Sequence, residues 1–213
     1  MNENLHLWHA DRGTYYDRNV NIISWSDKFH VRLGKYNSIG RDCNFFLHAN
    51  HRPDWITTSS QLLGPVNQDI ENMMFEMGHP SCKGDIIIEN DVWIGAKSTI
   101  MSGVKISNGA VIGATTTVTK DVPPYAIVVG NPGKIVKYRF SELQIDLLQK
   151  IEWWNWDEEK IKHEFKTLWS SNIDSFINKH INTVISSVLS LVQFKMFSIC
   201  SFFGPLGLLK MVS

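Results

Sequence analysis

The chain has 213 residues, which is enough for one substantial domain or for one domain with an appendage. Its 21 Lys and Arg balance 21 Asp and Glu, so no strong basic surface points to nucleic acid. The three cysteines (Cys43, Cys82 and Cys200) are far apart and form no CxxC pair, which argues against a disulfide framework or a zinc site.

The first thirty residues lack a basic start followed by an apolar segment, so we expect no signal peptide and a cytoplasmic protein. Three blocks follow, LGKYNS, IGRDCN and FFLHAN, and they open on Leu33, Ile39 and Phe45. An apolar residue at every sixth position is the first trace of a repeat that becomes regular later in the chain.

This spacing disappears between Asn50 and Lys83. A segment of that length is longer than a compact domain tolerates as an idle loop, and such excursions usually carry function. We therefore expect the loop 51–83 to contribute to a functional site.

The repeat is regular from Ile88 to Val122, where six blocks open on Ile or Val: IENDVW, IGAKST, IMSGVK, ISNGAV, IGATTT and VTKDVP. Residues six apart on a helix point about 240° away from each other, so the period excludes an amphipathic helix. Gly, Asn, Asp and Ser interrupt any continuous strand. Short strands joined by turns and stacked in coils remain, and a mainly β domain over 1–139 is predicted. We predict that the openers point inward, together with the residues four positions later: Val92, Ser98, Val104, Ala110, Thr116 and Val122.

Helices are predicted over 140–180, after Pro123 and Pro124 end the regular coils. Ser141 and Gln144 have the spacing of a capping box ahead of an apolar run of helical period. Asp157 is placed to cap a second helix.

The tail 181–213 is apolar and carries only two charges after His180, on Lys195 and Lys210. Neither of its apolar runs reaches the roughly twenty residues that span a bilayer. Three interpretations stay open: a helix that covers apolar surface of its own oligomer, a peripheral contact with the membrane interface, or a chain end with little role.

Residues 31–170 resemble the hexapeptide-repeat acyltransferases, in particular the xenobiotic acetyltransferases and the related enzymes that modify cell-surface sugars. The matching segments are NHRPDW, NDVWIGAKSTIMSGVKI, GAVIGATTTVTKDVPPYAIVVGNPGKIVKYRF and EWWNWDEEKI. The resemblance implies a left-handed parallel β-helix, acetyl-CoA as co-substrate, and a homotrimer whose active sites lie between subunits.

The resemblance implies His51 as the general base. An imidazole titrates near neutrality and can remove the acceptor's proton during direct attack on an acetyl thioester, while a backbone N–H meets the oxyanion. A surface histidine bonded to its own turn is the structural alternative. Asp54 is a candidate for orienting the imidazole. The candidates for binding the acceptor are Asp54, Trp55, His79, Tyr15 and Tyr16.

The resemblance also implies a cofactor groove along the coils. Small residues let a linear cofactor approach the backbone, and basic residues contact its phosphates. The candidates are Trp93, Gly95, Gly113, Ala114, Thr115, Lys120, Lys134, Lys137 and Arg139. The alternative is that the glycines serve turns and the lysines are solvated. No metal is expected, because His48 and His51 lie close together without a third ligand.

The leading interpretation is an acetyltransferase that modifies a hydroxyl or amino group of a surface polysaccharide, an O-antigen or a nucleotide-sugar precursor. The loop exit MGHPSCKGD is more similar to the sugar-modifying branch. The first alternative is acetylation of chloramphenicol or a streptogramin. A non-catalytic β-helix binding module is a more distant alternative.

Overall fold

The structure, a computed structural model, describes residues 5–17 and 19–182. The chain divides into two compact units, Met1–Phe140 and Ser141–Ser213. Within the described residues, no helix is both long enough and apolar enough to cross a membrane. The tail beyond residue 182 lies outside this description, so its three interpretations stay predictions.

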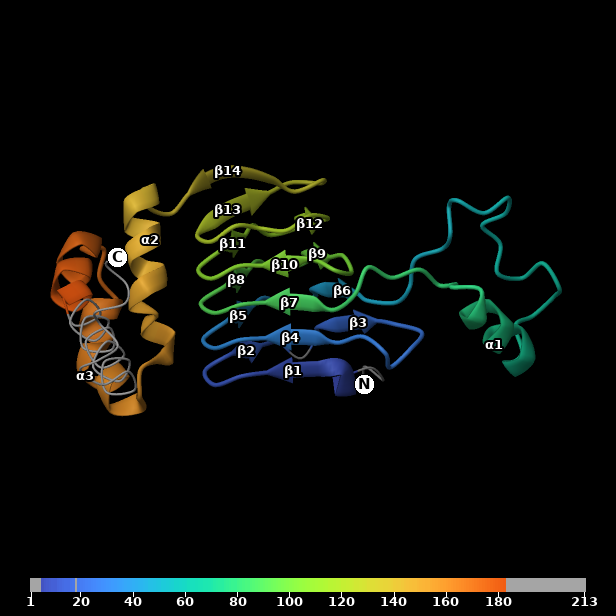
Figure 1. The fold of residues 1–213 in the computed structure, drawn as a ribbon, viewed down its shortest axis with the longest axis horizontal. Helices are drawn as coiled ribbons and strands as arrows, with labels where there is room; N and C mark the ends of the chain where they lie inside the picture. The colour runs from blue at the N-terminus through green and yellow to red at the C-terminus, as the bar shows by residue number, and fades with distance from the viewer. Residues whose placement is uncertain (1–4, 18, 183–213) are drawn as a thin grey trace, which may run out of the picture. The chain divides into compact units, whose positions relative to one another are not determined.

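The first unit is a parallel β-helix, as predicted, in which each coil adds a strand to each of three sheets (Figure 1). Sheet A contains β1 (Trp8–Ala10), β4 (Val31–Leu33), β7 (Ile86–Ile88) and β10 (Lys105–Ile106). Sheet B contains β2 (Tyr15–Tyr16), β5 (Ser38–Ile39), β8 (Trp93–Ile94), β11 (Val111–Ile112), β13 (Ala126–Val129) and β14 (Lys134–Tyr138). Sheet C contains β3 (Asn21–Ile23), β6 (Asn44–Phe46), β9 (Thr99–Ile100) and β12 (Thr117–Val118). A short 3-10 helix, Leu5–Leu7, precedes β1.

The six-residue repeat supplies the core of this unit. In sheet A, Ile88 pairs with Leu33 on one side and with Ile106 on the other. Every predicted block opener is buried, and so is every residue four positions later. Ser98 is a polar member of that second set, and its hydroxyl donates to the Gly95 carbonyl at 2.7 Å, so its burial leaves this hydroxyl paired.

One complete coil was missing from the sequence analysis. The strands β1, β2 and β3 lie before Leu33 and pair in register with the next coil, as Trp8 with Val31 and Ile22 with Phe45. The connections between β1, β2 and β3 have four residues each, as in the later coils, and Ala10, Tyr16 and Ile22 recur at every sixth position. Ala10 and Tyr16 are not the aliphatic residues that open the later blocks, and the seven residues between β3 and β4 shift the phase of the repeat.

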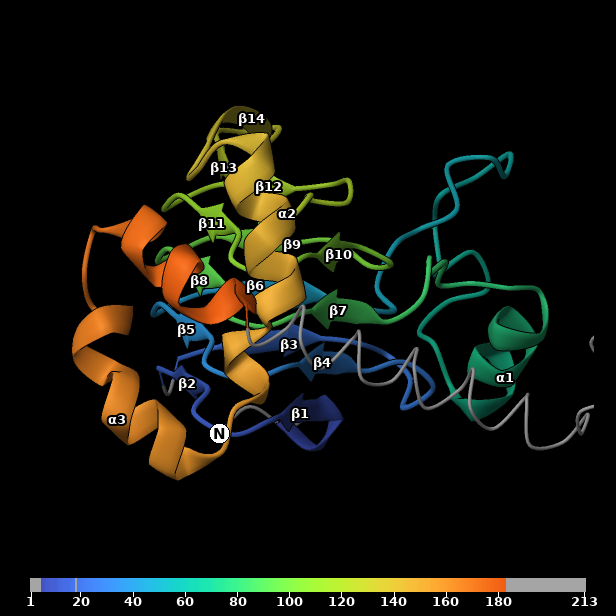
Figure 2. The ribbon, with the colours of Figure 1, turned by 60° about the vertical axis from the view of Figure 1, so that its left-hand side comes forward.

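The excursion leaves the coil after β6 and returns before β7, and Figures 1 and 2 show it projecting from the side of the β-helix. Asn50 and Ser81 form an antiparallel bridge at its base, with the Ser81 N–H donating to the Asn50 carbonyl at 2.6 Å. The excursion contains a helix that was not predicted, α1 (Gln68–Glu76). Asn67 caps it by accepting from the Ile70 N–H at 3.0 Å, and Asp69 and Glu71 lie in its first turn.

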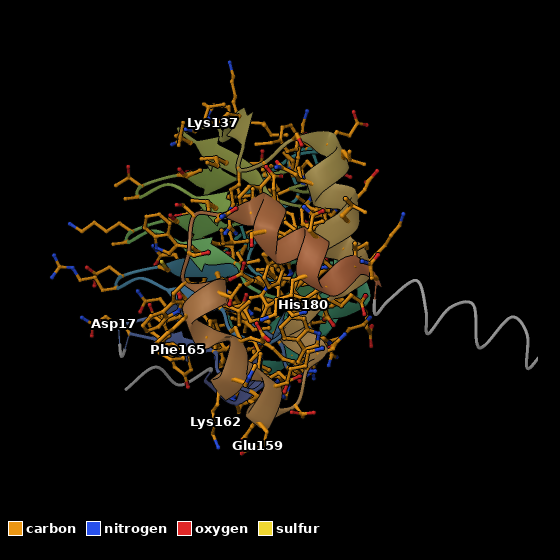
Figure 3. The ribbon with its side chains drawn as sticks, turned by 90° about the vertical axis from the view of Figure 1, so that its left-hand side faces the viewer. Asp17, Lys137, Glu159, Lys162, Phe165 and His180 are labelled. Atoms are coloured by element: carbon orange, nitrogen blue, oxygen red, sulfur yellow. The ribbon has the colours of Figure 1, made fainter. Side chains whose placement is uncertain are left out.

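The second unit is helical, and both predicted caps are confirmed. Helix α2 (Glu142–Ile151) begins at the Ser141–Gln144 capping box, and α3 (Glu158–Leu168) begins at Asp157, whose side chain accepts from the Lys160 N–H at 2.7 Å. The 3-10 helix Trp153–Asn155 joins them, and residues 173–182 are also helical. Figure 3 shows Glu159 and Lys162 on α3, 2.9 Å apart as an exposed ion pair.

Candidate active site

His51 stands where the chain leaves the coil, directly after the bridged residue Asn50. Its Nδ1 lies 2.6 Å from the carbonyl oxygen of Thr58. A carbonyl oxygen only accepts hydrogen bonds, so this contact places the proton of the neutral imidazole on Nδ1. Nε2 then carries a lone pair and can accept a proton from a bound molecule.

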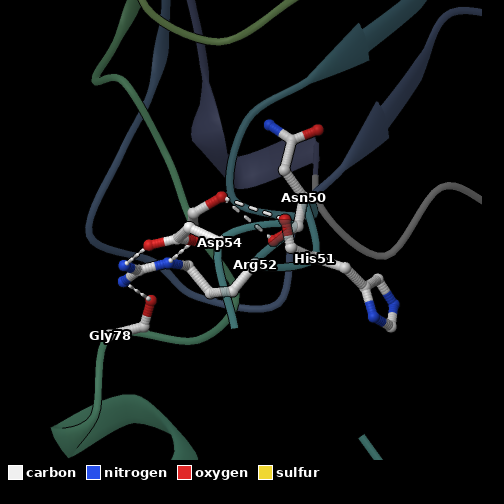
Figure 4. A network of polar contacts seen from close by, with 6 residues as sticks. Asn50, His51, Arg52, Asp54 and Gly78 are labelled. Carbon is white, nitrogen blue, oxygen red and sulfur yellow. Dashed lines mark hydrogen bonds and ion pairs between the residues drawn. The ribbon is translucent and has the colours of Figure 1, made fainter. Parts of the chain in front are cut away.

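Asp54 does not orient the imidazole. Its carboxylate is bound by the Arg52 guanidinium, with Nε at 2.8 Å from Oδ1 and Nη2 in contact with Oδ2. This hydrogen-bonded pairing lowers the pKa of Asp54 to about 2. Figure 4 shows the His51 imidazole pointing away from the Arg52–Asp54 pair. The orienting group is therefore the Thr58 carbonyl, which the sequence analysis missed.

Arg52 links the beginning of the excursion to its end. Its Nη1 donates to the Gly78 carbonyl at 3.3 Å (Figure 4), and its guanidinium lies 5.4 Å from the centre of the Trp55 ring. At the base, the Asn50 side chain donates to the Ser102 hydroxyl at 3.4 Å. His51 is thus held by a loop that is closed on itself and attached to the coils.

Two cavities share His51 as part of their walls. The first, the loop pocket, has a volume of about 310 Å³ and is enclosed by Trp25, Ala49, His51, Ser60, Gln61, Pro65, Val66, Glu71, Met74, Phe75, His79 and Pro80. The second, the coil groove, has a volume of about 600 Å³ and is lined by Asn50, His51, Arg52, Pro53, Asp54, Thr58, Ser81, Cys82, Lys83, Met101, Ser102 and Thr119. A molecule in either cavity can reach the imidazole.

The loop pocket has an apolar wall with a few polar groups, the character of a small-molecule site. Trp25 and Phe75 contribute aromatic rings to it, and His51 and His79 contribute imidazoles. The His79 ring is buried, with its centre 5.0 Å from that of His51 and 5.6 Å from that of Trp55. Burial, with His51 and Arg52 nearby, lowers the pKa of His79 and favours its neutral form.

Polar side chains from the coils and from both ends of the excursion take part in lining the coil groove. Ser102 and Thr119 come from successive coils, and Lys83 and Arg52 add positive charge at the excursion's two ends. Hydroxyls, backbone and cations in one groove suit an elongated polar ligand with anionic groups. Ser102, Thr119 and Lys83 were not among the predicted site residues, although Ser102 lies in the block IMSGVK.

Residues 85–120 match the family model "Bacterial transferase hexapeptide (six repeats)". A chloramphenicol acetyltransferase of Klebsiella aerogenes is 44% identical over 145 residues, which cover 66% of this chain and 67% of that one. A probable macrolide acetyltransferase of Lysinibacillus sphaericus is 43% identical over 155 residues, which cover 70% of this chain and 82% of that one.

The chain belongs to the hexapeptide-repeat acetyltransferases. Its β-helix is the left-handed parallel β-helix of this family, and its relatives place it in the xenobiotic branch. A solved hexapeptide-repeat acetyltransferase of Vibrio cholerae is 26% identical, with a TM-score of 0.47 over 63% of this chain and 64% of that one. The names of the sequence relatives favour the antibiotic alternative over the leading interpretation of a surface sugar.

The predicted cofactor residues of the acetyltransferase do not line either cavity, although Lys120 directly follows Thr119 of the coil groove. Trp93, Ala114 and Thr115 are exposed on sheet B or on its turn toward sheet C, whereas His51 follows a strand of sheet C. None of the predicted cofactor residues lines the loop pocket or the coil groove. Within one chain, neither cavity brings these residues to His51.

Close packing between coils accounts for the two predicted glycines. A Cβ on Gly95 would lie 2.5 Å from the backbone nitrogen of Ala114 on the next coil. A Cβ on Gly113 would lie 2.8 Å from a methyl group of Val129. The coils of this acetyltransferase need small residues there whether or not a cofactor passes over them.

The predicted basic residues differ in their surroundings. Lys120, Lys134 and Lys137 are exposed, and Figure 3 shows Lys137 extending from β14. Arg139 instead pairs with Asp91 at 3.1 Å and donates to the Gly109 carbonyl at 2.7 Å. Through these contacts Arg139 holds the end of the β-helix unit against its coils. A phosphate would therefore compete with Asp91 for the Arg139 guanidinium.

The tyrosine pair in β2 also lies apart from His51. Tyr15 is exposed, and the Tyr16 ring packs 4.9 Å from that of Trp8. Neither tyrosine lines the two cavities. Among the described residues, no group of three or more His, Cys, Asp or Glu side chains is placed to hold a metal ion.

Proposed function

We propose that this enzyme transfers the acetyl group of acetyl-CoA to a hydroxyl of a small amphiphilic xenobiotic of the chloramphenicol kind. The observation that carries the proposal is the position of His51 in the shared wall of the loop pocket and the coil groove. An acceptor in the loop pocket and a thioester in the coil groove both reach Nε2. Two reactants held at one base need no acyl-enzyme intermediate.

His51 moves one proton through the reaction. Its Nε2 takes the proton of the acceptor hydroxyl as that oxygen bonds to the acetyl carbonyl carbon. It returns the proton to the sulfur as the carbon–sulfur bond breaks, so the products are the acetyl ester and a free thiol. The Thr58 carbonyl holds Nδ1–H throughout and stabilises the transient imidazolium.

The lining of the loop pocket supports an amphiphilic acceptor. Trp25, Val66, Met74 and Phe75 provide the apolar wall, and His51 and His79 are among its polar groups. A charged nucleotide-sugar would leave its phosphates against this apolar wall, at a desolvation cost. A sugar hydroxyl remains the second candidate acceptor, since one face of a pyranose can pack on Trp25.

A homotrimer completes the site in this proposal. The trimer is supported by the observation that Trp93, Ala114 and Thr115 do not line the groove that contains His51 of the same chain. The excursion also exposes large apolar side chains, among them Ile56 and Leu63, as a subunit interface would require. The free thiols of Cys43 and Cys82 fit the cytoplasm, where acetyl-CoA is at hand. Sedimentation velocity would show a trimer, and a monomer would contradict this assembly.

Replacing His51 tests the proposed function. We expect His51→Ala to lower kcat by about two orders of magnitude or more, because general-base catalysis contributes about that much. Its Kd for acetyl-CoA should stay near that of the wild type. Turnover is measured as release of the free thiol with chloramphenicol, a macrolide and UDP-N-acetylglucosamine as acceptors.

The matched control is His9→Ala, which removes an exposed imidazole from β1, outside both cavities. This variant should keep wild-type turnover. Near-normal turnover of His51→Ala would remove His51 from the role of base.

A further inference from the structure

His79 is a buried polar side chain whose hydrogen-bonding capacity the fold leaves unused. It follows α1 directly, and its backbone N–H donates to the Met74 carbonyl at 2.8 Å, which fixes the residue against the helix end. The side chain is 4% exposed. Its Nδ1 is enclosed and has no hydrogen-bond partner among residues 5–17 and 19–182.

The environment of the ring selects one tautomer. With the proton on Nδ1, a buried N–H would have no acceptor, which costs more than leaving a lone pair bare. The proton of the neutral ring therefore resides on Nε2. His79 lines the loop pocket, and because Nδ1 is enclosed, the edge that a bound molecule can meet is the one that carries Nε2–H.

The two histidines of the loop pocket are then complementary. His51 presents a lone pair at Nε2, because its Nδ1–H is bound to the Thr58 carbonyl. His79 presents a donor. Their ring centres are 5.0 Å apart, a separation that two oxygens on neighbouring or next-neighbouring carbons of one molecule can bridge.

We propose that His79 donates a hydrogen bond from Nε2–H to a second hydroxyl oxygen of the acceptor, so that the loop pocket selects 1,2- or 1,3-diols. This inference rests on the proposed function, because the first hydroxyl is the one that gives its proton to His51. His79 is thereby an acceptor-binding residue, and the remaining apolar lining holds the body of the acceptor.

Two substitutions at His79 separate the hydrogen bond from the packing of the ring. His79→Phe keeps a buried aromatic ring and removes the N–H. His79→Gln places an amide N–H near the position of Nε2 and serves as the matched control. The acceptors are chloramphenicol, which carries a primary and a secondary hydroxyl, and its analogue without the secondary hydroxyl. Methyl β-galactoside and its monodeoxy analogues cover the sugar diols.

We expect the wild type to prefer the diol by about tenfold in kcat/KM, the value of one hydrogen bond. His79→Phe should bring this ratio close to one while its activity on the deoxy analogue stays within about threefold of wild type, and His79→Gln should keep the preference. An equal fall on both acceptors, or an unchanged ratio in His79→Phe, would overturn the proposal.

A binding measurement keeps this test separate from the proposed function. Calorimetry in the catalytically impaired His51→Ala background gives Kd for each diol and its deoxy partner, and Kd should favour the diol only while residue 79 retains a donor. Turnover that survives in His51→Ala would sink the proposed base but not the diol preference. Failure of both acceptor pairs to bind would overturn the assignment of the loop pocket.

Discussion

At the scale of single residues, the backbone orients His51, the proposed base. A sequence search for the partner of a histidine looks for a nearby carboxylate, and Asp54 was the obvious candidate. The excursion instead folds so that the Thr58 carbonyl meets Nδ1, while Asp54 pairs with Arg52. Every residue carries a carbonyl, so no side-chain pattern marks this contact in advance.

These separate contacts of His51 and Asp54 predict that Asp54→Asn has only a weak effect on activity. Because Asp54 contacts Arg52 rather than His51, we expect kcat to fall less than about fivefold, well below the loss of a catalytic base. The pKa of Asp54 is about 2 in the folded protein, so its carboxylate stays ionised as pH falls to about 3. The pH–rate profile of the variant between pH 5 and 9 should therefore coincide with that of the wild type.

Asp69→Asn is the control for this experiment, since Asp69 is an exposed carboxylate in the first turn of α1. A fall of a hundredfold in Asp54→Asn, or a displaced acidic limb of its profile, would mean that Asp54 does act on His51 during turnover.

At the scale of elements, the sequence predicted those coils and helices whose residues follow a local sequence pattern. The coil interior follows from the six-residue spacing, and the starts of α2 and α3 follow from Ser141 and Asp157. The first coil was not predicted because Ala10 and Tyr16 stand where the later blocks have aliphatic residues, and because the seven residues between β3 and β4 shift the phase of the repeat. Helix α1 was not predicted, although Asn67 and the acidic first turn are start signals, because it is a single short helix inside an otherwise irregular excursion.

The two coil glycines give a prediction at this scale. In Gly95→Ala the new Cβ meets the backbone of Ala114, which cannot move without displacing a coil, so we expect a loss of about 1–3 kcal/mol in the free energy of unfolding. In Gly113→Ala the nearest atom is a methyl group of Val129, which can change rotamer, and we expect a loss of less than about 1 kcal/mol. Urea titration measures both.

The Kd for acetyl-CoA, measured on the same two variants, separates packing from cofactor contact. Equal destabilisation of the two variants would refute the assignment of Gly95 to coil packing. A weakened Kd in a fully stable Gly113→Ala would instead identify Gly113 as part of the cofactor wall.

At the scale of the whole molecule, one chain supplies His51, the proposed base, and both cavities. The predicted cofactor wall, represented by Trp93, Ala114 and Thr115, lies on sheet B or on its turn toward sheet C. In the proposed trimer, His51 of one copy lies beside the cofactor wall of a neighbouring copy. Two inactive variants should then complement each other when co-expressed: His51→Ala lacks the base, and Ala114→Trp obstructs the wall at an exposed position. If the two variants assemble at random, about a quarter of the sites combine an intact His51 with an intact Ala114. We therefore expect about a quarter of wild-type turnover.

Co-expression of His51→Ala with His51→Gln is the matched control, because no site in such a mixture has a base. It should show no recovery. An absence of recovery in the first pair, with both variants assembled as trimers, would place the base and the wall of each site in the same subunit.

The bridge between Asn50 and Ser81 has a consequence for how such enzymes diversify. Since the excursion departs and returns at a single point, it forms a cassette whose contents can be replaced without disturbing the coils on either side. The loop pocket is built mainly from that cassette, whereas the deeper coil residues of the groove are not. Replacement of this one insert would therefore change the lining of the loop pocket while the coil residues Met101, Ser102 and Thr119 of the groove stay in place.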